Sequence, residues 1–303
     1  MSGAIPSPPG RRRRARTALV DLHCHSTASD GNVAPPDVAR RARQAGLAAI
    51  ALTDHDTLDG VAPAAAAGAA LGLRVICGCE FSVKAPWGEM HLLGYFLRVG
   101  HARLENFLRE TRDARRRRGV QMVERLQRLG IAIDVADVTA EAGAGAVGRP
   151  HVARALVRRG AAAHLQDAFS RFLGRGKAGY VEKPLPEFDQ VAELVHEVGG
   201  LTVAAHLGDR GAEPQLRQFK ARGLDGVEVR HPRHSPSTEA RLTRLAAELD
   251  LAVTGGSDWH GDGDAGDTHA PLGGLQIPAE WLDALERRAS AAPGASVAEP
   301  RHG

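Results

Sequence analysis

The sequence predicts an α/β fold, a distorted (β/α)7 barrel with a small helical insertion domain. The main observation is an alternation: from Leu19 onward, short apolar runs rich in Val, Ile and Leu alternate with Ala- and Arg-rich stretches of helical length. Parallel strands joined by crossover helices give this pattern. Between residues 100 and 183 the alternation stops and the chain is Arg-rich and helical, so we expect an insertion there. With 303 residues, the chain is long enough for one large domain of this kind.

The first part of the barrel, residues 19–99, contains four of the seven expected strands and two helices. Each expected strand is a short run of mostly Val, Ile, Leu and Ala, which suits a buried parallel strand. The first helix has clear boundaries, because Pro35 and Pro36 suit a first helical turn and Gly46 suits the position after the last one. The expected strands are 19–22, 48–52, 73–79 and 90–95, and the expected helices are 35–45 and 59–71.

The expected insertion, residues 100–183, starts with a charged helical stretch. The segment from Arg109 to Arg118 is dense in arginine, and an amphipathic segment from Val120 to Leu129 follows it. We interpret the block Arg115–Arg118 as a solvated helix face, with RNA contact as the alternative.

The second part of the barrel, residues 184–292, resumes the alternation. We expect a flexible tail at 293–303 and a disordered, Arg-rich arm at 1–18, which carries five arginines and no acid. The expected strands are 201–204, 226–229 and 251–254, and the expected helices are 212–222, 236–248 and 279–289.

Composition and charge exclude several classes of protein. The formal charge is +3, but without the five arginines of the arm the balance is 34 basic against 36 acidic residues, or −2. The basic character therefore belongs to the arm. We interpret the arm as a solvated start of the chain, and the alternative is that it binds RNA phosphates loosely. No apolar run approaches 18 residues, so we expect a soluble protein without a membrane partner.

The cysteines and the start of the chain suggest a location. Cys24, Cys77 and Cys79 are an odd number without zinc-type spacing, which suits a reducing cytoplasm. No hydrophobic stretch of signal-peptide length follows the arginines, so export is not expected. We predict a cytoplasmic protein with no obligatory protein partner.

The first candidate metal ligands follow the first expected strand. His23 and His25 are two residues apart, so on a strand they project to the same side and can each give one nitrogen to a metal ion. Asp30, five residues further on, can add a carboxylate. A lone histidine is more often structural, but a His-x-His pair at a strand end with a nearby Asp favours a metal site.

Two further candidates follow the second and third strands. His55 lies in Thr53-Asp54-His55-Asp56, where α/β barrels build their active sites, and Asp54 and Asp56 suit the orientation of this imidazole or of the local turn. A structural alternative for Asp56 is that it caps the next helix. Glu80 directly follows an apolar run, and its carboxylate can bridge two cations.

The remaining candidates come from later strands. His91 lies inside an expected strand and, alone, is a candidate core histidine, whereas His206 follows a strand of the second part. Asp258 and His260 form an Asp-x-His pair with the same spacing logic as His23 and His25. Because His and acidic residues recur at strand ends, we predict one site with two or three divalent ions. Nitrogen and oxygen ligands without thiolate favour Mn²⁺, Fe²⁺ or Zn²⁺.

In this order, these residues resemble the motifs of the polymerase and histidinol phosphatase (PHP) family of metal-dependent phosphoesterases. The resemblance spans Asp21 to Gly261 and implies that family's distorted barrel of seven strands. The motifs are His23-Cys24-His25, Thr53-Asp54-His55-Asp56, His206 and Ser257-Asp258-Trp259-His260. The resemblance implies three ion sites: His23, His25, Glu80 and Asp258 for one; Glu80, His91 and His206 for the second; Asp30, His55 and His260 for the third. Manganese is the favoured ion.

Within the family, the chain resembles a bacterial branch of 3′,5′-nucleoside bisphosphate phosphatases, which act on pAp, and 5′→3′ exoribonucleases that act on short RNA. The features that carry this are the Ser26–Gly31 continuation, the helical insertion, and the segments 148–151 and 226–235. The resemblance implies a nucleotide or short RNA as substrate. Histidinol phosphate is the second candidate, and a non-catalytic metal- or RNA-binding module is the third.

Four residues are candidates for substrate binding. Arg149 and His151 stand at the start of a helix, where free N–H groups and a guanidinium suit a phosphate; the alternative, which we favour less, is that Arg149 pairs on the surface of the insertion. Arg230 and His234 follow a strand end. The expected chemistry is attack on phosphorus by a hydroxide that bridges ions at Glu80, with His234 or a metal-bound water protonating the leaving oxygen.

Overall fold

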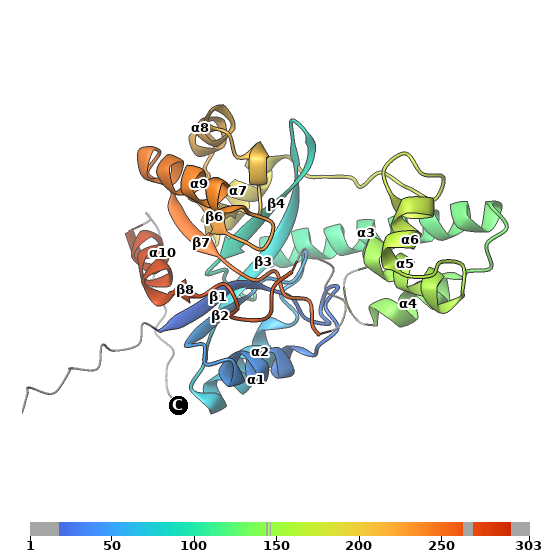
Figure 1. The fold of residues 1–303 in the computed structure, drawn as a ribbon, viewed down its shortest axis with the longest axis horizontal. Helices are drawn as coiled ribbons and strands as arrows, with labels where there is room; N and C mark the ends of the chain where they lie inside the picture. The colour runs from blue at the N-terminus through green and yellow to red at the C-terminus, as the bar shows by residue number, and fades with distance from the viewer. Residues whose placement is uncertain (1–17, 144, 146, 263–268, 292–303) are drawn as a thin grey trace, which may run out of the picture.

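The computed structural model describes residues 18–143, 145, 147–262 and 269–291, and it shows a barrel-shaped body with a helical lobe at one side (Figure 1). The predicted tail at 293–303 and all but the last residue of the predicted arm at 1–18 lie outside the described residues. No helix in the described ranges has both the length and the apolar character needed to cross a bilayer.

Within the described residues, eight strands form one sheet in the order β7-β6-β5-β4-β3-β2-β1-β8. The sheet is nearly closed, because the segment after β7 returns to β1: the His25 N–H donates to the Trp259 carbonyl at 2.8 Å, and the Asp258 N–H donates to the His23 carbonyl at 2.9 Å. The predicted α/β barrel is therefore confirmed. The strands are β1 Leu19–Cys24, β2 Ala49–Leu52, β3 Arg74–Ala85, β4 Gly88–Tyr95, β5 Leu201–Ala204, β6 Gly226–Arg230, β7 Ala252–Gly255 and β8 Ile277–Pro278.

The strand directions correct the expectation that the strands are parallel and joined by crossover helices. β4 is antiparallel to both β3 and β5, and only a two-residue turn, Pro86 and Trp87, joins β3 to β4. A crossover helix is therefore absent from this connection, and β3 extends six residues beyond the predicted end at residue 79. The short β8, antiparallel to β1, adds an eighth strand to the seven expected.

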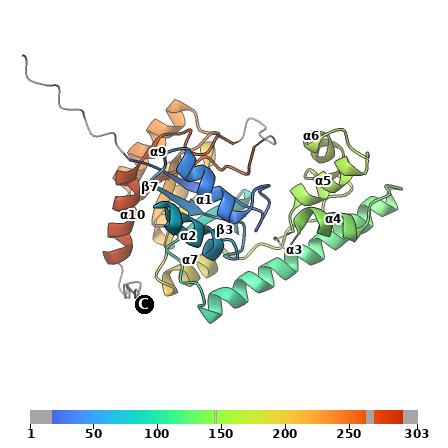
Figure 2. The same ribbon diagram turned by 90° about the horizontal axis from the view of Figure 1, so that it is seen from below.

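Six helices cover the outside of the barrel (Figures 1 and 2). The predicted helices match within two residues at each end. A helix at 188–197 was not predicted, although Phe188, Val191, Ala192 and Val195 give it a buried face at helical spacing. The six are α1 Pro35–Gln44, α2 Val61–Leu71, α7 Phe188–Glu197, α8 Glu213–Ala221, α9 Pro236–Glu248 and α10 Ala279–Ala291.

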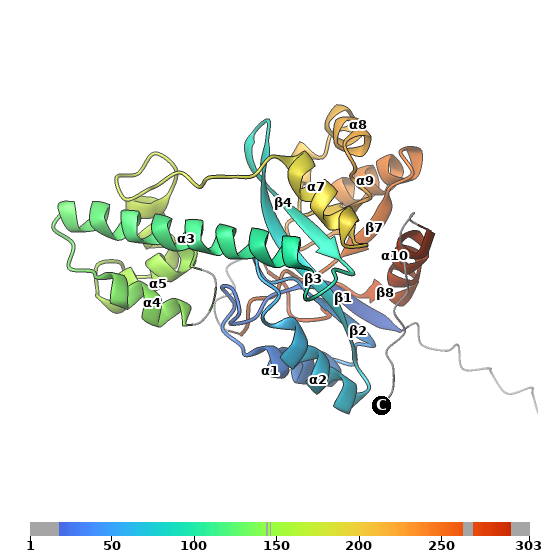
Figure 3. The ribbon, with the colours of Figure 1, turned by 180° about the vertical axis from the view of Figure 1, so that it is seen from behind.

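The helical lobe is carried by α3, Ala102–Arg128, which starts against the barrel and runs outward (Figure 3). Leu104 and Leu108 pack in the barrel core, whereas Met122, Val123 and Leu126 belong to a separate hydrophobic cluster of the lobe. The other elements of the lobe are α4 Val135–Ala142, α5 Arg149–Arg158, α6 Leu165–Ala168 and a π-helical turn, Phe169–Leu173. One helix thus connects two hydrophobic cores.

The interpretation of Arg115–Arg118 as a solvated face was wrong for two of its four members. Arg116 and Arg117 are exposed, but Arg115 and Arg118 are buried. The Arg115 Nε donates to Asp56 Oδ2 at 2.6 Å, and the Arg118 Nε donates to the Val181 carbonyl at 2.8 Å. Residues three apart share a helix face, so the buried face of α3 includes both.

Candidate metal centre

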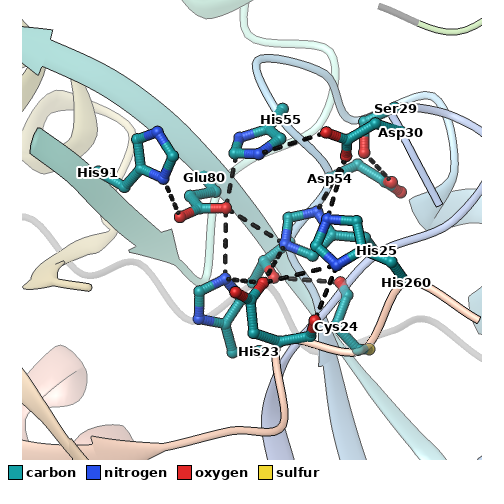
Figure 4. Close-up of polar contacts among 12 residues, drawn as sticks. His23, Cys24, His25, Ser29, Asp30, Asp54, His55, Glu80, His91 and His260 are labelled. Atoms are coloured by element: carbon teal, nitrogen blue, oxygen red, sulfur yellow. Dashed lines mark hydrogen bonds and ion pairs between the residues drawn. The ribbon is translucent and has the colours of Figure 1, made fainter. Parts of the chain in front are cut away.

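The nine predicted metal ligands meet at one end of the barrel, and Figure 4 labels all of them except His206 and Asp258. Glu80, on β3, lies in the middle and is 1% exposed. Its Oε2 is 3.3 Å from His23 Nε2, 3.2 Å from His25 Nε2 and 3.3 Å from His55 Nδ1. Its Oε1 is 2.8 Å from His91 Nδ1 and 3.0 Å from His206 Nε2. One carboxylate therefore contacts five imidazoles.

The other two carboxylates close the cluster on either side of His25. Asp258 Oδ1 lies 3.2 Å from His25 Nε2 and 3.4 Å from His23 Nε2. Asp30 Oδ1 lies 3.3 Å from His260 Nε2 and 4.0 Å from His25 Nδ1, and Asp30 Oδ2 lies 3.8 Å from His55 Nε2. The two nitrogens of His25 thus face two neighbouring groups of candidate ligands.

Among the described residues, five groups of His, Asp and Glu have donor atoms within 4.8 Å of one another, and three of these groups consist only of predicted ligands. The group of His23, His25, Glu80 and Asp258 is the same as one of the ligand sets that the family resemblance implied. A second group adds His25 to the implied set of Asp30, His55 and His260. In a third group, His55 takes the place of His206 beside Glu80 and His91. His206 adjoins the third, with its Nε2 3.3 Å from His91 Nδ1. These three groups are His23, His25, Glu80 and Asp258; His25, Asp30, His55 and His260; and His55, Glu80 and His91.

Buried polar atoms without hydrogen bonds support metal binding. Among the described residues, His23 Nε2, both ring nitrogens of His25, His55 Nδ1 and Asp30 Oδ1 are buried and have no hydrogen-bond partner. Such atoms are costly unless something else satisfies them. Neutral imidazole nitrogens and carboxylate oxygens are the donors that Mn²⁺, Fe²⁺ and Zn²⁺ accept, so the residues fit divalent cations.

The cluster is electrostatically prepared for cations. Burial alone would raise the pKa values of Glu80 and Asp258, but the surrounding imidazoles hold both well below their usual range. Burial alone would lower the pKa of His25, but the neighbouring Asp258 and Glu80 carboxylates raise it to about 10. His55 differs, because burial lowers its pKa to about 3. The carboxylates are therefore ionised and offer negative charge that cations can neutralise.

Further residues, not predicted from the sequence, support the ligands from behind. One carboxylate oxygen of Glu228, on β6, lies 3.0 Å from His23 Nδ1. The other oxygen accepts a hydrogen bond from the His206 backbone N–H at 2.8 Å. His231 Nε2 and His269 Nδ1 lie 3.4 and 3.5 Å from Asp258 Oδ2. The sequence did offer a signal for Glu228, because it is a charged residue inside the apolar run Gly226–Val229. A carboxylate buried in a strand needs a polar partner, and this need points to a role beside the site.

Residues with unusual backbone conformations also lie at the site. Asp56, His206 and Asp258 adopt positive φ angles of 52°, 31° and 52°, which non-glycine residues rarely do. Asp54 accepts hydrogen bonds from the Ser26 N–H and from the hydroxyls of Ser26 and Ser29, so it orders the turn that leads to Asp30. This agrees with the expectation that Asp54 orients a local turn.

Asp56 has a different role from the cap that was its structural alternative. Gly60 precedes the first residue of α2, and no side chain caps that helix. Asp56 instead accepts from Arg115 on α3 and from the Ser82 N–H on β3. The residue after His55 is therefore fixed from both the lobe and the barrel.

A cavity of about 690 Å³ opens between the centre and the helical lobe; we call it the larger cavity. On the barrel side it is lined by ligand candidates such as Glu80 and Asp258, and on the lobe side by Arg154, His164 and Phe169. Arg154 was not predicted as a site residue. A substrate in this cavity would lie between the candidate metal centre and a wall with a cationic and an aromatic side chain.

The four predicted substrate-binding residues do not line the larger cavity. His151 is buried, and its Nδ1 accepts from the Gly148 N–H at the start of its own helix. Arg230 donates to the carbonyls of Leu275 and Gln276, away from the centre. These two predictions do not fit the structure, because backbone groups that the sequence pattern does not reveal occupy both side chains.

Arg149 and His234 are also engaged elsewhere. The Arg149 guanidinium lies 6.0 Å from the Phe169 ring and 5.8 Å from the Tyr180 ring. His234 Nδ1 is 2.8 Å from the Val229 carbonyl, and its Nε2 accepts from the Gly208 N–H at 3.0 Å. Both ring nitrogens of His234 thus contact backbone groups, and the residue also lines a second cavity beside the centre, so its expected catalytic role stays a prediction.

Comparison with known proteins agrees with this site. The model of the PHP domain matches residues 21–200. A 5′-3′ exoribonuclease of Haemophilus influenzae is 34% identical over 251 residues, which are 80% of this chain and 90% of that protein. A 3′,5′-nucleoside bisphosphate phosphatase of Chromobacterium violaceum is 34% identical over 258 residues, which are 82% of this chain and 90% of that protein.

A solved structure gives the same result in three dimensions. A Bifidobacterium adolescentis protein, described as a metal-dependent phosphoesterase, superimposes with a TM-score of 0.83 at 34% identity, covering 89% of this chain and 96% of that one. The matching family model spans more than half of the chain and both relatives exceed 30% identity over most of their length. The chain therefore belongs to the PHP-domain family.

Proposed function

We propose that this protein is a metal-dependent phosphoesterase that hydrolyses nucleotides: 3′,5′-nucleoside bisphosphates such as pAp, short 5′-phosphorylated RNA, or both. One observation carries the proposal: a partly buried cluster of six imidazoles and three carboxylates, with unpartnered donor atoms, borders a cavity that is also lined by arginine. The printed names of the relatives, an exoribonuclease and a nucleoside bisphosphate phosphatase, support this substrate class.

The residues present would hold two or three divalent ions, with Mn²⁺ favoured, through the groups around Glu80, Asp258 and Asp30. Bound cations supply charge neutralisation on phosphate oxygens and lower the pKa of water from about 15.7 to about 7. The side chains themselves fix positions: Glu228 holds the His23 ring, and Arg115 holds the residue after His55.

The substrate side of the larger cavity suits a nucleotide. Arg154 on α5 and Arg233 on the loop after β6 both line it, and guanidinium groups bind phosphate oxygens. Phe169 offers an aromatic surface to a base on the lobe side. These residues replace the predicted contacts at His151 and Arg230.

An activity panel on the Mn²⁺-loaded protein tests the proposal. The panel contains pAp, a short 5′-phosphorylated RNA and histidinol phosphate, and it compares the unaltered chain with Asp258→Asn, His23→Ala and the exposed control Asp113→Asn. We expect hydrolysis of pAp or the RNA, a loss of more than about 100-fold in the first two variants, and no change in the control. Full activity of Asp258→Asn would refute the proposal.

The same panel separates the two alternatives. Preferred hydrolysis of histidinol phosphate would make the protein a small-metabolite phosphatase, and metal binding without hydrolysis would make it a binding module. The location we infer is the cytoplasm, because Cys24, Cys77 and Cys79 are all unpaired thiols and a reducing compartment preserves them.

A further inference from the structure

A second cavity adjoins the candidate metal centre from another side. It has a volume of about 440 Å³, and we call it the smaller cavity. His91, His206 and Arg233 line both this cavity and the larger one. The two cavities therefore meet at the centre, with Glu80 in contact with both shared imidazoles.

The smaller cavity carries positive charge that the fold does not use. The side chains of Arg210 and Arg233 are exposed and form no ion pair or hydrogen bond with the residues that the structure describes. Of the two acids of the lining, Glu89 is already paired, whereas Asp209 is fully exposed. Glu89 accepts from Lys183 at 2.9 Å, and the Asp209 carboxylate points into solvent with Arg241 at 4.0 Å. Two unpaired guanidinium groups beside a hydrolytic centre suit a phosphate.

The smaller cavity also has a fixed aromatic side chain. Trp87 lines it from the two-residue turn between β3 and β4, where the hairpin holds the backbone in register. The indole is half-buried and lies edge-on to the Phe219 ring, with centroids 6.0 Å apart. A ring held in this way offers a surface on which a nucleobase can stack.

We propose that the smaller cavity is a second nucleotide subsite, so that the substrate crosses the centre with one nucleotide in each cavity. This inference rests on the proposed function. The scissile phosphate would lie at the junction near Glu80, His91 and His206, and the neighbouring phosphate and base would lie on Arg210, Arg233 and Trp87. Water adds to phosphorus, the P–O bond to the leaving sugar breaks, and the leaving oxygen takes a proton.

This arrangement predicts a preference for substrates long enough to reach both cavities. A 5′-phosphorylated dinucleotide fills both subsites, whereas p-nitrophenyl phosphate reaches only the junction. Substitutions in the smaller cavity should therefore weaken hydrolysis of the dinucleotide and spare that of the small ester.

The first test compares kcat/KM of the Mn²⁺-loaded protein on 5′-phosphorylated diadenylate and on p-nitrophenyl phosphate. We expect Arg210→Ala and Trp87→Ala to lose about 10-fold or more on the dinucleotide and less than about 2-fold on the ester. Trp87→Phe, which keeps an aromatic face, should recover most of the loss. Arg217→Ala, on the exposed side of α8, serves as the matched control and should behave like the unaltered chain.

The second test measures binding without turnover. Isothermal titration of 5′-phosphorylated diadenylate into Asp258→Asn and into Asp258→Asn with Arg210→Ala should show an affinity about 10-fold lower in the second protein. Equal binding, or equal losses on both substrates in the first test, overturns the second subsite. If the unaltered chain cleaves neither of these substrates nor pAp, the proposed function itself fails, and that result is distinct from an active enzyme whose rates do not depend on Arg210 and Trp87.

Discussion

At the scale of single residues, the centre depends on how each imidazole is turned. Glu80 contacts five rings, but a ring can present either nitrogen, and only a partner on its other side fixes the choice. For His23 that partner is Glu228, which lies 3.0 Å from Nδ1 and leaves Nε2 toward Glu80 and Asp258. Glu228 is fully buried and also holds the His206 backbone, so it serves two candidate ligands.

We therefore expect Glu228→Gln to weaken Mn²⁺ binding about 10- to 100-fold, because the amide keeps the size of the side chain but loses the charge that orients His23. Competition with a chelator of known affinity measures the effect directly, independently of catalysis. Glu193→Gln, on the exposed side of α7, is the matched control. Unchanged affinity in Glu228→Gln would show that Glu228 only fills space.

At the scale of elements, α3 connects the lobe to the centre through a buried ion pair. Arg115 and Asp56 are 7% and 1% exposed, and Asp56 directly follows His55. Burial would lower the pKa of Arg115, and the Asp56 carboxylate outweighs this and raises it, so the guanidinium stays charged. A buried pair of this kind is costly to break from one side, since the remaining charge is left without a partner.

Arg115→Met should lower the free energy of unfolding by about 3 to 5 kcal/mol, and the double substitution Arg115→Met with Asp56→Asn should recover part of that loss. Urea unfolding of chelator-treated protein measures both without a contribution from bound metal. Arg116→Met changes the next residue of the same helix, which is exposed, and should cost less than about 0.5 kcal/mol. Similar losses for Arg115→Met and Arg116→Met would contradict the ion-pair argument.

The elements also show what a sequence can and cannot reveal. α9 was predicted at its observed bounds because its signals are local: Pro236 suits the first turn, and the Ser235 hydroxyl caps it. The extension of β3 to Ala85 and the antiparallel β4 were not predicted, because they depend on pairing between strands rather than on a local pattern. The orientations of His151 and Arg230 failed for the same reason: their partners are backbone groups revealed only by the fold.

At the scale of the whole molecule, the centre joins parts of the chain that are far apart in sequence. His23, His25 and Glu80 come from the first part of the barrel, whereas Asp258 and His260 come from the segment that closes it. Most of the nine candidates were predictable because they follow or end an expected strand, and strands of a barrel end at a common face; His91, inside a strand, is the exception. Their grouping around one carboxylate was not, because it depends on the angles between the strands.

Because the candidate ligands come from both the first and the second part of the barrel sequence, metal binding should stabilise the entire fold and not only the loops that carry the ligands. A cation that binds only the folded chain adds about 2.7 kcal/mol at a concentration 100 times its Kd, which for a domain of this size raises Tm by about 5 °C or more. Thermal unfolding followed by circular dichroism, with Mn²⁺ and with excess chelator, measures this shift. Asp258→Asn should lose most of it, and Asp113→Asn should keep it. An equal shift in Asp258→Asn would mean that the ion binds elsewhere, and the assignment of the centre would then be wrong.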